Sequence, residues 1–223
     1  MDHRGLDFIV STLQEKYSYR FKWLGRPIIQ LPQDIVAIQE IIWEVSPDYV
    51  IETGTAHGGG LVLYASILEC LGRGKVLGID VDPREENMKA LEHHPLRHRI
   101  SVIKGDSVDP QILDAVKDWV CPLPDTTLII LDSLHTRDHV LQELRLYAPL
   151  VSVGSYIIVM DTVIEYLPPN SFPDRPWDIG NNPATAVRQF LLEGGSKEFE
   201  VDWSIEEKLL ITAAPGGFLR RVK

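Results

Sequence analysis

Cysteine, long apolar runs and positive charge are all scarce in this sequence. Cys70 and Cys121 are the only cysteines among 223 residues. They are too few for a disulfide framework or a thiolate zinc site, which indicates a reducing compartment. No apolar run approaches the roughly 20 residues that a membrane-spanning helix needs, and residues 1–23 lack the apolar core of a signal peptide. We therefore expect a cytoplasmic protein without a membrane span.

Acidic residues dominate the charge. The 32 Asp and Glu residues outnumber the 22 Lys and Arg residues, which gives a formal net charge of -10. Duplex nucleic acids and anionic membranes require a concentrated basic surface, so neither is expected as a partner. The one basic cluster, FLRRVK at 218–223, is short and is interpreted as solvated surface.

Five apolar runs alternate with segments of helical periodicity. The runs are continuous rather than alternating, which is typical of strands buried on both faces; they cover 48–55, 75–82, 100–106, 127–133 and 155–162. Apolar residues recur at helical spacing in 59–72, 83–95, 109–120 and 136–151. This βα repeat predicts an α/β protein with a parallel sheet and helices on both sides.

The flanking segments complete one domain. A helix at 184–195 and two strands at 198–203 and 209–214 are expected to close the sheet with an edge hairpin. The element order predicts a Rossmann-like, seven-stranded class I methyltransferase sheet with an N-terminal helical cap. We divide the single domain 1–223 into a cap (1–46), a cofactor-binding βα core (47–162) and a substrate loop, helix and closing β-hairpin (163–223).

The stretch YVIETGTAHGGG, residues 49–60, ends a predicted strand in an acidic, glycine-rich turn. An ordinary strand-to-helix connection explains it, and so does a turn that admits a ligand against its backbone. Its glycines miss the G-x-G-x-x-G spacing of dinucleotide sites, and Glu52 would repel phosphates. The sulfonium and ammonium of S-adenosylmethionine fit an acidic turn better.

Further acids follow the next strands, where ligands of open α/β sheets bind. Asp80 can accept the ribose hydroxyls of a nucleoside. Asp106 and Ser107 can contact an adenine edge or cap a helix. Asp132 and Asp161 end neighbouring strands and together offer hard oxygen ligands for Mg2+, with His135 as a nearby base. In the other interpretation, Asp132 caps a helix and His135 is a surface residue.

Several motifs in order resemble one family. They are WLGRPIIQLPQDI, IETGTAHGGG, GIDVD, LDSLHT with HVLQEL, VMDT and NNPATAVRQFL, and they span about residues 17–192. Together they are similar to the cephalosporin hydroxylase and rhamnosyl O-methyltransferase family. The resemblance implies S-adenosylmethionine- and magnesium-dependent methylation of a hydroxyl, often on a sugar.

By this resemblance, Glu52, Thr53, Gly54 and Gly58 would line the methionine portion of the cofactor, Asp80 its ribose, and Asp132 and Asp161 the metal. His135 would be the base. The family tends to have an acidic residue where this chain has Met160, a soft ligand that Mg2+ does not prefer. Glu165 or water is the expected replacement.

Acceptor recognition is assigned to the cap and to the proline-rich loop 165–183. Four aromatic side chains there offer faces on which sugars stack, although each also suits a packing role: Tyr17, Trp23, Tyr166 and Trp177. The expected acceptor is a small molecule or oligosaccharide, and the family resemblance implies self-association into a homo-oligomer.

Two other functions compete with methyl transfer. Asp132, His135 and His139 would form a two-histidine, one-carboxylate iron site, which would make the protein an oxygenase. A non-catalytic nucleoside-binding regulatory domain is the third interpretation, since Met160 departs from the metal-binding pattern.

Overall fold

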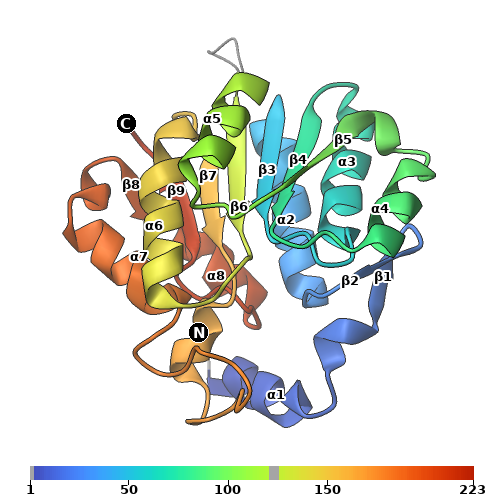
Figure 1. Ribbon diagram of the computed structural model, residues 1–223. Helices are drawn as coiled ribbons and strands as arrows, with labels where there is room; N and C mark the ends of the chain where they lie inside the picture. The colour runs from blue at the N-terminus through green and yellow to red at the C-terminus, as the bar shows by residue number, and fades with distance from the viewer. Residues whose placement is uncertain (1–2, 121–125) are drawn as a thin grey trace.

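A computed structural model describes residues 3–120 and 126–223, so Cys121 lies outside the described residues. Its centre is a seven-stranded sheet with the order β5-β4-β3-β6-β7-β9-β8 (Figure 1). The strands are β3 (Tyr49–Thr53), β4 (Lys75–Asp80), β5 (Ile100–Lys104), β6 (Thr127–Leu131), β7 (Tyr156–Val159), β8 (Phe199–Val201) and β9 (Phe218–Arg221). The five from β3 to β7 are parallel and confirm the five predicted strands.

Helices cover both faces of this sheet. They are α2 (Pro32–Val45), α3 (Gly59–Leu71), α4 (Glu85–Glu92), α5 (Pro110–Trp119), α6 (Arg137–Tyr147), α7 (Pro183–Leu192) and α8 (Trp203–Leu209). Successive strand residues alternate between two cores: Val50 packs with α2 and α3, whereas Ile51 packs with α5, α6 and α7. A continuous apolar strand is required because each face meets a helix layer.

Local sequence signals start two of the helices. Asp109 caps α5 by accepting the Gln111 backbone N–H, and Pro110 occupies the first turn. Asn182 caps α7 in a capping box with Thr185. Both caps satisfy backbone donors that a helix start leaves free.

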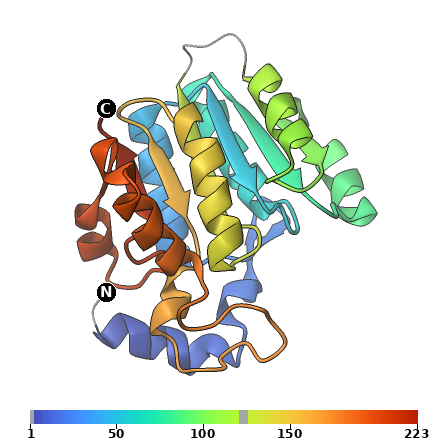
Figure 2. The same ribbon diagram turned by 60° about the vertical axis from the view of Figure 1, so that its left-hand side comes forward.

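The N-terminal residues form the predicted helical cap. It contains α1 (His3–Leu13), the short hairpin β1 (Phe21–Trp23) and β2 (Arg26–Ile28), and α2. Ile9 of α1 packs with Leu31 and with Val163 and Leu167, which follow β7. Both views show α1 beside the loop after β7 at one end of the sheet (Figures 1 and 2). The cap and that loop are therefore one packed unit.

The predicted closing hairpin is only half right. Residues 199–201 form β8 as expected, but 203–209 form helix α8, whose first turn is capped by Asp202 accepting from Ser204 N. The second strand is β9, which pairs antiparallel with both β7 and β8. The FLRRVK segment is therefore part of the sheet, not solvated surface, and its Phe218 and Leu219 are buried.

None of the helices in the described residues combines the length and apolar character needed to cross a membrane.

Candidate active site

Strand order reverses between β3 and β6, and the acidic residues collect at this point. Thr53 pairs with Leu131, so the segments that follow both strands begin side by side. The Asp132 backbone N–H donates to the Thr53 carbonyl at 3.0 Å. Open α/β sheets bind ligands where strand order reverses, and this site occupies that position.

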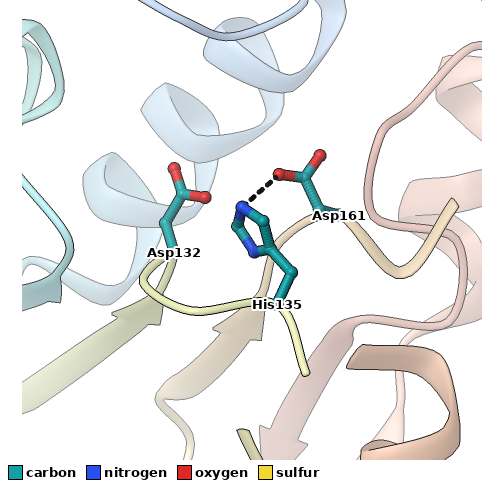
Figure 3. A group of neighbouring side chains, drawn as sticks. All are labelled: Asp132, His135 and Asp161. Atoms are coloured by element: carbon teal, nitrogen blue, oxygen red, sulfur yellow. Dashed lines mark ion pairs between the residues drawn. The ribbon is translucent and has the colours of Figure 1, made fainter. Parts of the chain in front are cut away.

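Asp132, His135 and Asp161 form one group. One potential ligand atom from each lies within 4.8 Å of those of the other two. The His135 imidazole lies between the two carboxylates, with Nε2 at 3.1 Å from Asp161 Oδ2 (Figure 3). The segments that follow β6 and β7 thus bring together the three residues that the sequence singled out.

A network of bonds fixes the turn that presents Asp161. This residue has a left-handed backbone, with φ of 56°, which is uncommon for a residue other than glycine. The Thr162 hydroxyl donates to Pro215 O at 2.8 Å, and Val163 N donates to Ala213 O at 3.1 Å. Ala213 N in turn donates to Asp34 of α2 at 2.8 Å. The turn is held by the 213–215 segment and, through it, by the cap.

Negative charge is concentrated and partly buried here. Burial, followed by the nearby Asp161 carboxylate, raises the pKa of Asp132 well above its usual range. Burial also raises the pKa of Asp34 to about 7, although hydrogen bonds from Thr212 and Ala213 oppose the shift. Neighbouring carboxylates with raised pKa values favour a bound cation, which would stabilise their ionised forms.

The glycine-rich turn after β3 forms a small cavity. Its volume is about 30 Å3, and its lining includes Gln30, Glu52, Gly54, Gly60 and Asp132. Glu52 is 3% exposed and accepts a 2.6 Å hydrogen bond from the Tyr64 hydroxyl. Burial raises the pKa of Glu52 to about 8, against the effect of that hydrogen bond.

The other predicted cofactor residues surround the same turn. Thr53 is fully buried, Gly54 N donates to Ile79 O at 2.8 Å, and Gly58 is the N-cap of α3. Asp80 Oδ2 accepts from Thr55 N at 2.9 Å and from the Thr55 hydroxyl at 3.0 Å. Asp80 therefore supports the turn in this structure, and its contact with a ribose stays a prediction.

Ser107 does not have the environment expected of an adenine ligand. Its hydroxyl donates to Glu143 Oε1 at 2.6 Å, and Ser133 donates to the same oxygen at 2.8 Å. His139 Nε2 lies 3.4 Å from it. Glu143 has no exposed surface, so the Ser107 hydroxyl belongs to a buried polar cluster. The exposed Asp106 remains the predicted adenine contact on this loop.

The four aromatic residues that are predicted to contact the acceptor lie in two different environments. Trp177 lies edge-on to His135, with ring centroids 4.8 Å apart, and Tyr166 is exposed in the 3-10 turn that follows Asp161. Tyr17 instead packs edge-on against Phe8 and Phe21. Trp23 donates its indole N–H to Ser66 of α3 at 3.0 Å. These contacts indicate packing roles for Tyr17 and Trp23 in place of the predicted acceptor contacts.

Met160 and Glu165 both lie outside the group of candidate metal ligands. Met160 is a core residue, 2% exposed. Glu165 accepts from Gly180 N and from the Asn182 side chain, at 2.8 and 2.6 Å, so it anchors the loop before α7. Within the described residues, the third candidate ligand is His135.

The predicted iron set is not assembled. His139 contacts Ser107, Ser133 and Glu143, and it is not among the grouped ligands of the described chain. Burial lowers the pKa of His139, but Glu143 outweighs this effect and raises it above 6.5.

Sequence interpretation missed three buried polar residues near the site: Gln30, Asp34 and Glu143. Glu143 gave a usable signal, because it follows Val140 by three positions and precedes Tyr147 by four, which places it on the apolar face of α6. Asp34 resembled a first-turn acid of α2. Gln30 lies between two apolar segments and gave no signal.

A family profile described as "Rhamnosyl O-methyltransferase/CmcI" matches residues 15–222. The chain belongs to this family. The match begins after α1 and spans the N-terminal hairpin, α2, the acidic group and the closing strands.

Curated relatives carry the same family name. The rhamnosyl O-methyltransferase of Mycobacterium tuberculosis is 34% identical over 190 residues, which cover 84% of this chain and 73% of that protein. The rhamnosyl O-methyltransferase of Mycobacterium leprae is 29% identical over 227 residues, covering 99% of this chain and 94% of the relative.

Solved structures share the fold. A structure of CmcI with Mg and SAM has a TM-score of 0.62 and 17% identity, covering 92% of this chain and 78% of that one. MycE methyltransferase from the mycinamycin biosynthetic pathway, in complex with Mg and SAH, has a TM-score of 0.53 and 18% identity, covering 87% and 47%. These similarities confirm the predicted class I methyltransferase fold.

Proposed function

We propose that this protein is an S-adenosylmethionine-dependent O-methyltransferase that methylates a hydroxyl of a sugar or glycoside with the assistance of Mg2+. The observation that carries the proposal is the group of Asp132, His135 and Asp161 beside the acidic cavity at the strand-order reversal, in a chain of the rhamnosyl O-methyltransferase family. The names of the relatives support a sugar acceptor.

The donor set fits a divalent cation. Asp132 and Asp161 offer hard carboxylate oxygens, which Mg2+ prefers, and the raised pKa of Asp132 indicates that its charge lacks a counter-ion among the described residues. A cation held by these two residues would stabilise an alkoxide as a Lewis acid. Asp34 and the 213–215 segment would keep the Asp161 turn in position.

His135 would act as the general base. A sugar hydroxyl has a pKa far above 7 and is a weak nucleophile until its proton is removed. His135 would accept that proton through the ring nitrogen that does not face Asp161, and Asp161, whose Oδ2 lies 3.1 Å from Nε2, would orient the imidazole. Trp177, edge-on to the ring, would restrict its rotation and border the acceptor.

The first turn would bind the methyl donor. S-adenosylmethionine, when bound, supplies an electrophilic methyl group on a sulfonium. Glu52 and the lining of the turn would hold its methionine portion, Asp80 its ribose and Asp106 its adenine. Asp80 would have to share Oδ2 with Thr55 or exchange that partner.

Different segments of the chain would bind the cofactor and the acceptor. The core, 47–162, would bind the cofactor, whereas the cap and the segment 163–223 would recognise the acceptor. A cytoplasmic location and the lack of a nucleic-acid partner stay predictions from composition, and self-association stays a prediction from the family resemblance.

Methyl transfer to rhamnose-containing glycosides tests the proposal. The protein is incubated with S-adenosylmethionine, Mg2+ and a panel of such glycosides, and mass spectrometry detects methylated product with and without EDTA. Product that depends on Mg2+ supports the proposal. Cofactor binding without methyl transfer to any acceptor would favour the regulatory alternative, and hydroxylated product with iron and 2-oxoglutarate would favour an oxygenase.

A further inference from the structure

Gln30 places a buried, unpartnered oxygen beside the cavity of the first turn. Its side chain is 4% exposed and lines the cavity together with Glu52. Its Oε1 is buried and has no hydrogen-bond partner within the described residues. A buried acceptor without a partner costs about 1 to 3 kcal/mol, so a ligand donor at this atom would be favourable.

The N-terminal hairpin reaches the cavity because α3 begins with glycines. A Cβ on Gly59 would lie 2.1 Å from Pro27 O and 2.7 Å from Ile28 Cα. A Cβ on Gly60 would lie 2.5 Å from Glu52 Oε1. Only glycine permits these close approaches. They bring the segment that leads to Gln30 against the start of α3 and leave the Glu52 carboxylate beside it.

The hydrogen bonds fix which way the Gln30 amide points. Tyr64 donates its hydroxyl proton to Glu52 Oε1 at 2.6 Å, so its oxygen is left to accept. Gln30 Nε2 donates to that oxygen at 3.4 Å. With the amide reversed, Gln30 Oε1 would face an oxygen that has no proton to give. The network therefore directs Oε1 away from Tyr64.

Two acceptors remain for a ligand. One is Gln30 Oε1, and the other is Glu52 Oε2, for which no hydrogen bond occurs within the described part of the chain. The cavity of about 30 Å3 has room for a small polar group. A small cationic donor such as an ammonium matches these acceptors, whereas a carboxylate or phosphate does not.

We propose that Gln30, together with Glu52, recognises the ammonium group of the cofactor's amino-acid end, with Tyr64 as the residue that positions both side chains. This proposal rests on the proposed function, because it assumes S-adenosylmethionine as the ligand. It assigns a segment of the N-terminal cap to cofactor binding. It also predicts that the protein binds nucleosides that carry the amino-acid end more tightly than those that lack it.

Calorimetric titration with two ligands tests this assignment. S-adenosylhomocysteine has the ammonium, and 5′-methylthioadenosine lacks the whole amino-acid end. Gln30→Met removes the acceptor at similar volume. Since a hydrogen bond to a charged group contributes about 1.5 to 3 kcal/mol, we expect S-adenosylhomocysteine to bind about 10- to 100-fold more weakly. The affinity for 5′-methylthioadenosine should change by less than about twofold.

Two further variants control for structural damage. Gln33 on α2 also has a buried Oε1 without a partner but does not line the cavity, so Gln33→Met should leave both affinities unchanged. Gln30→Glu restores an acceptor and should recover most of the preference for S-adenosylhomocysteine. Equal loss of both ligands in Gln30→Met, or no loss of either, would overturn the assignment. If the unmodified protein bound neither ligand, the proposed function would fail as well.

Discussion

Replacing Glu52 with glutamine should remove a large part of the pH dependence of folding stability. The folded protein holds the pKa of Glu52 at about 8 against a reference value of 4.5. The folded state therefore binds a proton that the unfolded state releases between these pH values, and stability falls as pH rises through this window. The cost is about 1.5 kcal/mol near pH 5.5, about 3 kcal/mol at pH 7 and about 4.5 kcal/mol near pH 8.5.

Urea denaturation of the unmodified protein and Glu52→Gln at these three pH values measures the effect. Glutamine keeps an acceptor for the Tyr64 hydroxyl, so a change in the strength of this hydrogen bond contributes a similar offset at every pH. The stability of the variant relative to the unmodified protein should rise by about 3 kcal/mol from pH 5.5 to pH 8.5. Acids whose pKa does not depend on Glu52, such as Asp34, titrate in both proteins and cancel in the difference.

A difference that stays constant across the range would refute the reasoning. It would mean that Glu52 is ionised in the folded protein, and that burial beside Asp80 does not control its charge. An acidic turn that is neutral until a cation arrives would then be the wrong description of this site.

Three more perturbations test separate parts of the site. Asp161→Asn should abolish methyl transfer yet change the calorimetric affinity for S-adenosylhomocysteine by less than about twofold, because this carboxylate pairs with His135, outside the first turn. Equal loss of both would show that the metal assignment is wrong. Glu143→Ala should cost about 3 to 5 kcal/mol in urea denaturation, because Ser107, Ser133 and His139 lose their shared acceptor, and a cost below about 1 kcal/mol would contradict this role. Trp177→Ala should raise KM for the acceptor with cofactor affinity unchanged; a KM equal to that of the unmodified protein would exclude Trp177 from the acceptor site.

The sequence predicts the βα core well because each strand is buried on both faces. Val50 and Ile51 face different helix layers, and such strands read as continuous apolar runs. Parallel strands end at one edge of the sheet, so Asp132 and Asp161, which directly follow two neighbouring strands, are predicted to lie together. His135 followed from its three-residue distance from Asp132.

The remaining errors arise where tertiary contacts override local pattern. Residues 209–214 are mostly apolar and are predicted to form a strand. In the structure, Leu209 ends α8, and Phe218 and Leu219 pair antiparallel with β7 instead. Side-chain direction is also not encoded locally. Ser107 follows a strand end as expected, yet Glu143, 36 positions further on, turns its hydroxyl into the interior.

Binding of a divalent cation to the acidic group, coupled to catalysis, is the central claim of this account. Its most direct measurement is methyl transfer from S-adenosylmethionine to a rhamnosyl glycoside at increasing Mg2+ concentration, in the unmodified protein and in Asp132→Asn. We expect activity that saturates with Mg2+, disappears with EDTA and is absent in the variant. Methyl transfer at full rate in EDTA, or unchanged Mg2+ dependence in the variant, would contradict the claim.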